Sequence, residues 1–416
     1  MIIGIGLFVL FTLLPLLDSK RRTKVEVIKA VITLIAAAAL VLGVLFFQLS
    51  YVLGVLLLIL LTILIDKNTY TRKMLLIYGS LLVVIVGGLY WIFRDNPEYV
   101  ANHLQKHPQS SSLFVAKAGE PIIEYNVDSV RPLASTVKIV VALEYAFQVE
   151  EGRINQEQLV SMEELDRLYI PGTDGGAHEK WKAQLSNKKE VTLHEVAEGM
   201  IKYSSGANTD YLMILLTIDA INERIESLGI HPHEPVYPIV GAFVIGLYLQ
   251  QENLVEDDLE NELKKLPLEE YRILATNLSK EMLLEGTSYG DISNLSLKVQ
   301  RVWSDHLIGS SASAYGKLLA AISRDEYPER VSSIMRDLLE WPLEYESNKE
   351  RFTHIGAKGG STAFVLNQAM YIQTKEGERI EIVLLMDDLN WWNRLLLTNN
   401  IDSFLMDIIE GNKIDL

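Results

Sequence analysis

The stretch Pro132-Leu133-Ala134-Ser135-Thr136-Val137-Lys138-Ile139-Val140-Val141-Ala142-Leu143 places a serine and a lysine at the head of an apolar run. Positions three apart share a helical face, so the Ser135 hydroxyl and the Lys138 amine are expected to meet. A hydroxyl becomes a nucleophile when a neighbouring base accepts its proton. The stretch therefore predicts a serine nucleophile with a lysine base. A serine that opens a helix also suits an N-cap, and this plainer role stays open at this point.

The spacing alone does not single out this pair, because Ser186 and Lys189 show it too. That second pair lies in a polar stretch with no apolar helix to bury its amine. The run after Lys138 removes the amine from water, and the positive end of a helix also disfavours a nearby ammonium. We therefore assign the reactive pair to Ser135 and Lys138.

The composition limits the classes of partner. The chain has 416 residues, no cysteine and a formal net charge of −16. Without cysteine there are no disulfides, thiolate metal sites or cysteine nucleophiles. The acidic charge is concentrated after Arg94, so this part of the chain repels polyanions, and nucleic acid is not an expected partner.

Residues 1–94 have the pattern of a membrane region with four spans. The four apolar stretches are Ile2–Leu17, Val27–Gln48, Tyr51–Ile65 and Met74–Phe93. Basic residues crowd the first and third connections, which places both on the cytoplasmic side. Four spans then put everything after Arg94 outside the cytoplasm. The alternative is a buried apolar helical hairpin, which the length of the second and fourth stretches disfavours.

The order of elements after the membrane region predicts an α+β domain. Residues 95–111 are polar, contain two prolines and are typical of a stem. Two short apolar runs around Ala118–Pro121 predict a β-hairpin, many helices follow, and two strands with a helix close the chain. We expect one antiparallel sheet in which the chain ends meet, flanked by helices, with an all-helical subdomain. The acidic stretch 250–305 is expected to be a solvated helical insertion, or else a cover for the cleft.

Two further stretches carry groups that the chemistry needs. Ser204 lies in a helix-breaking turn, where its hydroxyl can pass a proton to a leaving nitrogen. Lys358 stands just ahead of a predicted strand, followed by glycines that let backbone approach a ligand closely. There it can anchor a carboxylate and help to keep Lys138 neutral by like-charge repulsion. The backbone N–H groups of Ser135 and Ser361 are candidates for an oxyanion hole.

Together these motifs resemble a known superfamily. The chain from Ser112 to Leu416 is similar to the serine β-lactamases and penicillin-binding D,D-peptidases, and most closely to their class A β-lactamase-like branch. The resemblance rests on the sequence around residues 135–138, 204–208 and 358–362, with a hairpin before and two strands after. It implies a β-lactamase/transpeptidase-like fold over 112–416.

The resemblance also implies roles for individual residues. Ser135 corresponds to the acylated nucleophile, Lys138 to a general base for acylation, and Ser204 to the proton-transfer serine. Lys358 and Gly360 belong to the motif that recognises the substrate carboxylate.

The second and third motifs depart from the family pattern. The asparagine usual in the second motif is replaced by Gly206, and Asn208 either substitutes for it or only serves the helix. The threonine or serine usual in the third motif is replaced by Gly359, so Ser361 or Thr362 is the candidate source of the hydroxyl.

The glutamate with which class A β-lactamases deacylate rapidly has no clear counterpart. The nearest candidate is Glu234, in a proline-rich loop where a surface carboxylate is also an ordinary feature.

The sequence as a whole predicts a membrane-anchored, extracytoplasmic serine hydrolase that forms an acyl-enzyme on a D-alanyl peptide of the cell wall or on a β-lactam. The alternatives are a class A-like β-lactamase with rapid turnover and a slow or non-catalytic sensor or interaction domain. No cofactor is expected. No metal is expected either, because His231 and His233 have no apparent third ligand.

Overall fold

The computed structural model describes residues 94–416, apart from 187, 252–255, 293–294 and 415. The four predicted membrane segments lie outside the described residues. Between Arg94 and Leu416, as far as the chain is described, no helix is long and apolar enough to cross a membrane.

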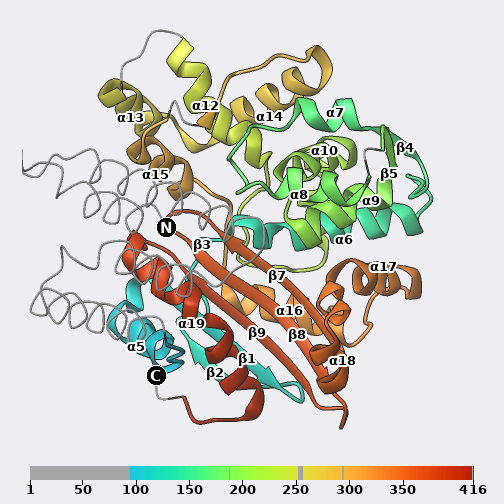
Figure 1. The fold of residues 1–416 in the computed structure, drawn as a ribbon, viewed down its shortest axis with the longest axis vertical. Coiled ribbons are helices and arrows are strands. Elements are labelled where there is room, and N and C mark those ends of the chain that lie inside the picture. The colour runs from blue at the N-terminus through green and yellow to red at the C-terminus, as the bar shows by residue number, and fades with distance from the viewer. Residues whose placement is uncertain (1–93, 187, 252–255, 293–294, 415) are drawn as a thin grey trace, which may run out of the picture. The chain divides into compact units, whose positions relative to one another are not determined.

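A five-stranded sheet joins the two ends of the described chain (Figure 1). Its strands are β1 (Ser111–Lys117), β2 (Glu120–Tyr125), β7 (Phe352–Ser361), β8 (Leu366–Thr374) and β9 (Arg379–Met386). They lie in the order β2-β1-β9-β8-β7, and every pair is antiparallel. The predicted α+β class, with chain ends meeting in one antiparallel sheet, is therefore confirmed. The third motif lies inside β7 rather than ahead of a strand, which corrects its predicted position.

Both faces of the sheet are buried. Along β9, Ile382 and Leu384 join one apolar cluster and Val383 and Leu385 join the other. Side chains alternate between the two faces of a strand, so a sheet covered on both sides gives a continuous apolar run, as in Ile382–Met386 of β9. Helices α5 (Glu98–Lys106) and α19 (Trp391–Glu410) cover one face, and α16 (Ala312–Ser323) packs on the other.

The prediction of a stem at 95–111 is wrong. Asp95–Leu416 form one compact unit, and α5 buries Val100 and Leu104 beneath the sheet. The backbone N–H of Asn96 donates to the Asn400 side chain on α19 at 2.6 Å. The polar residues of this stretch occupy the solvent side of an amphipathic helix, which composition alone does not distinguish from a linker.

The other α-helices of the described chain lie above the sheet and to its right in Figure 1. They are α6 (Lys138–Glu150), α7 (Met162–Arg167), α8 (Ala177–Gln184), α9 (Leu193–Glu198), α10 (Gly206–Leu216), α11 (Ile218–Ser227), α12 (Ile239–Gln251), α13 (Glu256–Lys265), α14 (Leu268–Glu285), α15 (Leu297–Asp305), α17 (Glu329–Leu339) and α18 (Glu346–Arg351). Two short ladders complete the described chain, β3 (Arg131–Pro132) with β6 (Gly309–Ser310), and β4 (Leu159–Ser161) with β5 (Glu190–Thr192).

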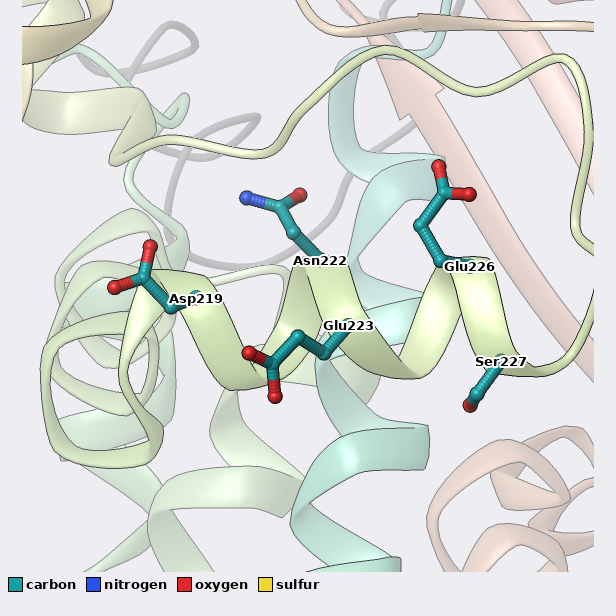
Figure 2. A pocket seen from close by; sticks show the side chains of 5 residues that line it. All are labelled: Asp219, Asn222, Glu223, Glu226 and Ser227. Atoms are coloured by element: carbon teal, nitrogen blue, oxygen red, sulfur yellow. The ribbon is translucent and has the colours of Figure 1, made fainter.

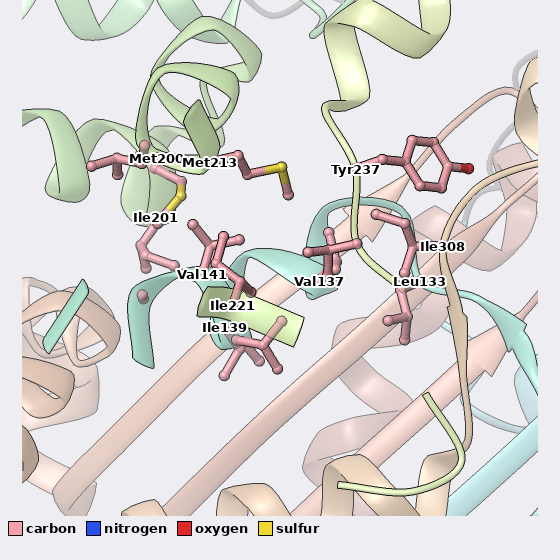
Figure 3. Packing of buried hydrophobic residues seen from close by; sticks show 14 of the residues in the cluster. Leu133, Val137, Ile139, Val141, Met200, Ile201, Met213, Ile221, Tyr237 and Ile308 are labelled. Carbon is pink, nitrogen blue, oxygen red and sulfur yellow. The ribbon is translucent and has the colours of Figure 1, made fainter. Parts of the chain in front are cut away.

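Helix α6 is the centre of this helical part. All of its residues from Lys138 to Val149 are buried, so the helix is enclosed on every side. Figure 3 shows Ile139 and Val141 among apolar side chains from other segments, including Met200 and Met213. The apolar run of the opening stretch therefore anchors the reactive pair in the core.

The acidic stretch 250–305 is not only a solvated surface. Helix α14 buries Tyr271, Ala275, Leu278 and Met282 and packs on α12. The Tyr271 hydroxyl donates to the backbone carbonyl of Ala242 at 3.0 Å. One face of this stretch is thus part of the domain core.

Candidate active site

The candidate nucleophile lies in a tight turn that several contacts hold. Ser135 occupies a 3₁₀ turn, Ala134–Val137, immediately before α6. Ala134 has a φ of +47°, a left-handed conformation that costs a non-glycine residue roughly 1–2 kcal/mol. The Asn367 side chain on β8 donates to the carbonyls of Pro132 at 2.8 Å and Leu133 at 3.0 Å, which fixes the turn. Such strain persists where the surroundings over-determine the backbone, as they do here.

The Ser135 side chain is not engaged by its neighbours. It is partly exposed, and within the described part of the chain its hydroxyl has no hydrogen-bond partner. The N-cap of α6 is Val137, without a side-chain cap, so the plainer role of Ser135 as an N-cap does not hold.

The Lys138 amine contacts Ser204 of the second motif. Its Nζ donates to the backbone carbonyl of Ser204 at 2.6 Å and to the Ser204 Oγ at 3.1 Å. These two contacts take the place of the expected contact between the Lys138 amine and the Ser135 hydroxyl. Burial lowers the pKa of Lys138 to about 7, against the opposing charges of Asp174 and Asp210. Near neutral pH a large share of the amine is therefore uncharged and able to accept a proton.

A second buried lysine approaches the same oxygen. Lys358 Nζ donates to the Ser204 Oγ at 3.0 Å and to the carbonyl of Gly359 at 2.9 Å. Burial and the nearby Lys138 charge hold the pKa of Lys358 well below its usual range. A hydroxyl has two acceptor lone pairs and one hydrogen, so two N–H donors leave the hydrogen of Ser204 for a substrate atom. Ser204 itself has a φ of +71°, which turns it out of the preceding π-helix Gly199–Tyr203.

Strand β7 passes directly beside the nucleophile turn at Gly360. A Cβ atom at this position would lie 2.5 Å from the Leu133 carbonyl oxygen and 2.9 Å from the backbone nitrogens of Ser135 and Thr136. Only glycine therefore permits this approach. It places the exposed Ser361, the next residue, beside the turn that carries the Ser135 N–H.

The side chains of two predicted site residues form hydrogen bonds with groups other than the reactive residues. The Asn208 side chain is fully buried, donates to the Val196 carbonyl at 3.1 Å and accepts from the Ser205 hydroxyl at 3.1 Å. Of the two roles that the sequence left open for Asn208, these contacts favour the one in which it serves the helix, and its candidate role as a substitute for Gly206 is not supported. Thr362 is buried and its hydroxyl is bonded to Ser304 at 2.8 Å, within the turn between β7 and β8.

The Glu234 carboxylate is bonded to other groups. Its carboxylate accepts the backbone N–H of Gly309 at 3.0 Å and lies 3.6 Å from Arg272. Gly309 pairs with Pro132 in the β3–β6 ladder, so Glu234 supports the strand that precedes the nucleophile turn. Among the described residues no hydrogen bond or ion pair joins Glu234 to Ser135, Lys138 or Ser204.

Two acidic residues near the site were missed in the sequence. Asp174 accepts four backbone N–H groups, three at the start of α8 and the fourth from Gly206 at 3.3 Å. An aspartate before a Gly-Gly pair and a helix is an N-cap signature, so this residue could have been found. Asp210 is fully buried and accepts from Ile239, Gly241 and Ser279, and no local pattern marks it.

A series of hydrogen-bonded polar side chains supports the second motif. His178 is fully buried, with Nδ1 2.9 Å from the Ser205 hydroxyl and Nε2 3.0 Å from Asp166. The order serine, histidine, aspartate is that of a hydrolase triad, but Ser205 is also fully buried and a substrate does not reach it. These hydrogen bonds therefore hold the turn that carries Ser204.

A surface hollow of about 660 Å³ lies apart from these groups. Figure 2 shows its lining on the single helix α11: Asp219, Asn222, Glu223, Glu226 and Ser227. None of the reactive residues lines it, so it has no part in the chemistry described above.

Comparison with known proteins identifies the family. The model of a family described as "Beta-lactamase enzyme family" matches residues 97–402. This chain belongs to that family. The β-lactamase family match includes all three motifs, and so agrees with the resemblance found in the sequence.

Several solved structures are similar to the chain. A class A β-lactamase from Bacteroides cellulosilyticus is 14% identical, with 77% of this chain and 100% of that chain covered and a TM-score of 0.47. A β-lactamase from Sphaerobacter thermophilus is 16% identical, with 76% and 99% covered and a TM-score of 0.49. The acyl-enzyme complex of PBP-A with penicillin G is 15% identical, with 75% and 96% covered and a TM-score of 0.45. A search of curated proteins found no match.

Proposed function

We propose that this β-lactamase-family protein is a serine hydrolase that forms an acyl-enzyme at Ser135 with a β-lactam or a D-alanyl peptide of the cell wall. One observation carries the proposal: two buried lysine amines converge on the Ser204 Oγ, at 3.1 and 3.0 Å, and the partly exposed Ser135 lies in the turn just before the helix that begins with Lys138. Burying two amines costs free energy of folding, and buried titratable groups of this kind are found chiefly at functional sites.

The proposed acylation uses groups already in place. The Ser135 Oγ bonds to the substrate carbonyl carbon, and its proton passes to the neutral Lys138 amine, one helical turn away. The Ser204 hydroxyl, bonded to that amine, gives its hydrogen to the leaving nitrogen as the C–N bond breaks and is reprotonated by Lys138. The backbone N–H groups of Ser135 and Ser361 stabilise the oxyanion. The products are an ester on Ser135 and a free amine, which stays tethered when the substrate is a β-lactam.

We further propose that the acyl-enzyme is long-lived. Among the described residues no carboxylate contacts the Ser135 hydroxyl, and Glu234 is bonded to Gly309. Without a carboxylate to activate water, the ester hydrolyses slowly. This favours a peptidase-like enzyme or a slow-turnover sensor over a rapid β-lactamase.

The location of the site is also a proposal. The four apolar stretches before Arg94 and the basic residues of their first and third connections support an anchored domain outside the cytoplasm. A reporter fused after Asp95 should be active only outside the cytoplasm. Activity inside would refute the four-span topology.

Labelling with a fluorescent penicillin tests the chemistry. The full-length protein is incubated with the probe, and the mass of the peptide containing Ser135 is followed over time. Label that persists on Ser135 is the expected result, while rapid loss with ring-opened product would show a fast β-lactamase. Unchanged labelling of the Ser135→Ala variant would refute the assignment of Ser135 as the nucleophile.

A further inference from the structure

Helix α19 exposes a small apolar patch in its first two turns. Trp391, Trp392 and Leu395 are 74%, 39% and 39% exposed. Leu395 follows the two tryptophans by four and three residues, and these spacings place the three side chains on one helical face. The two indole rings lie edge to face, with centroids 5.4 Å apart. We call these three residues the tryptophan patch. Single exposed apolar residues are ordinary, whereas a contiguous group is a candidate contact surface.

Hydrogen bonds hold the start of α19 in place. The Asn390 side chain caps the helix by accepting the backbone N–H of Asn393 at 2.8 Å. Arg394 Nε donates to the carbonyl of Thr362, in the turn between β7 and β8, at 2.5 Å. The tryptophan patch is therefore carried on a fixed part of the domain.

The chain enters the domain beside this part of α19. The Asn96 N–H bonds to Asn400, and the Tyr99 hydroxyl donates to Asn393 Oδ1 at 3.4 Å, so α5 packs along the first turns of α19 (Figure 1). The fourth apolar stretch of the sequence ends at Phe93, and the three residues from there to Asn96 span at most about 10 Å. If that stretch crosses a bilayer, as proposed above, the bilayer surface lies close to the start of α19.

The chemistry of the patch suits the lipid headgroup layer. A tryptophan has an apolar body and a polar N–H, and tryptophans are enriched at the headgroup level of membrane proteins. From residue 391 to residue 400 the one charged side chain is that of Arg394. The part of the chain after Arg94 is acidic, so attraction to anionic lipids does not supply the contact. The contact therefore depends on the aromatic rings and forms on a neutral bilayer too.

A second copy of the chain fits this surface less well. A stable protein interface needs about 800 Å² from each partner, whereas one aromatic side chain buries about 150–250 Å². Two partly exposed tryptophans and a leucine supply much less than that area. The exposed residues just before the patch, Asp388 and Asn390, are polar and do not extend it.

We propose that the tryptophan patch docks on the headgroup layer of the bilayer in which the chain is anchored. The inference rests on the proposed location of the protein, and it adds a second point of attachment to the covalent connection at Arg94. Because Arg394 ties α19 to the turn that follows β7, docking also fixes the orientation of β7 and the nucleophile turn on the membrane.

Spin labelling tests the contact, and the absence of cysteine allows a single label at a chosen position. Thr398 is exposed and lies seven residues after Trp391, on the same helical face, so a nitroxide on Thr398→Cys reports on the patch without altering it. The full-length protein is reconstituted in phosphatidylcholine vesicles, and the collision rates of the nitroxide with oxygen and with a water-soluble nickel chelate are measured. Leu284→Cys is the matched control, since Leu284 is 74% exposed, on α14, which lies apart from α19 (Figure 1).

We expect the label at 398 to collide with the nickel chelate several-fold less often than the label at 284, with oxygen collisions at least as frequent. Adding Trp391→Ala and Trp392→Ala should restore the chelate collisions at 398, because the rings hold this face among the headgroups. Adding Leu284→Ala to Thr398→Cys should change neither rate.

Equal chelate collisions at the two positions, or a value at 398 that the tryptophan substitutions leave unchanged, would overturn the inference. Shielding of the label from both reagents would overturn it as well. In that case, spectral broadening that dilution with unlabelled protein removes would show a second copy, and its absence would show cover by another part of the chain. A full-length protein that alkaline carbonate releases from the vesicles would instead overturn the proposed anchoring, and this inference with it.

Discussion

Two neighbouring glycines of β7 give a sharp test of the site geometry. In Gly360→Ala the new methyl group would meet only backbone atoms, at 2.5 and 2.9 Å. In Gly359→Ala it would meet the flexible end of Gln368 at 3.1 Å and the Asn367 carbonyl at 3.6 Å. The two variants add the same atom to adjacent residues, so they differ only in what the methyl group encounters.

The displacement can be worked out from these distances. An ordinary contact begins at 3.4 Å, so β7 and the Ser135 turn must separate by roughly 0.5–0.9 Å in Gly360→Ala. A misplacement of about 1 Å at a reacting centre costs on the order of 100-fold in rate. Overpacking of this kind also costs about 1–3 kcal/mol of stability. Gly359→Ala should stay within a few-fold of the wild type and unfold at nearly the same urea concentration, since Gln368 can move aside.

The assay is the rate of Ser135 acylation by a fluorescent penicillin, measured on folded protein, together with urea unfolding. The reasoning fails if Gly360→Ala is acylated at the wild-type rate. It fails equally if Gly359→Ala is as slow as Gly360→Ala, because the loss would then not come from contact with the nucleophile turn.

Three other outcomes follow from contacts described above. The acylation rate should rise with pH through a midpoint of about 7, because only the neutral Lys138 amine accepts the serine proton; a flat profile between about pH 5 and 9 would exclude Lys138 as the base. Ser204→Ala removes the shared oxygen of both lysines and should slow acylation by about 10²- to 10⁴-fold at unchanged fold by circular dichroism. Arg131→Met leaves the Asp387 carboxylate, 2.8 Å from the arginine, without its buried partner and should cost about 3–5 kcal/mol in urea unfolding. The exposed pair of Arg351 and Glu410 is the control, and Arg351→Met should cost less than about 1 kcal/mol.

The sequence predicted the sheet and the buried helix after Lys138 because both depend on local pattern. The pairing of Ser135 with Lys138 stays a prediction, since the Lys138 amine bonds to Ser204 in the structure. Apolar runs with turn residues between them specify the β1–β2 hairpin, and the run after Lys138 specifies a buried helix. The burial that lowers the pKa of Lys138 was implied by the same run. These features need no knowledge of distant contacts.

The parts that were wrong or left open depend on distant contacts. The sequence leaves two roles open for Asn208, and the choice between them depends on a distant contact, because its amide bonds to Val196 on another helix. The sequence predicts a stem at 95–111, because most of the surface that α5 covers is made by strands at the other end of the chain. The pairing of Gly359 with Gln368 is set by the length of the turn between two strands, which composition does not reveal.

The enclosure of α6 determines how the site behaves in time. Backbone amides in a helix buried on every side exchange with solvent only when the whole domain opens, whereas loops and chain ends exchange through local fluctuations. Ser135 precedes this helix directly, so the serine rests on one of the last segments of the domain to unfold. A covalent adduct there would stay attached to intact structure while the periphery fluctuates, and its lifetime would be set by chemistry alone.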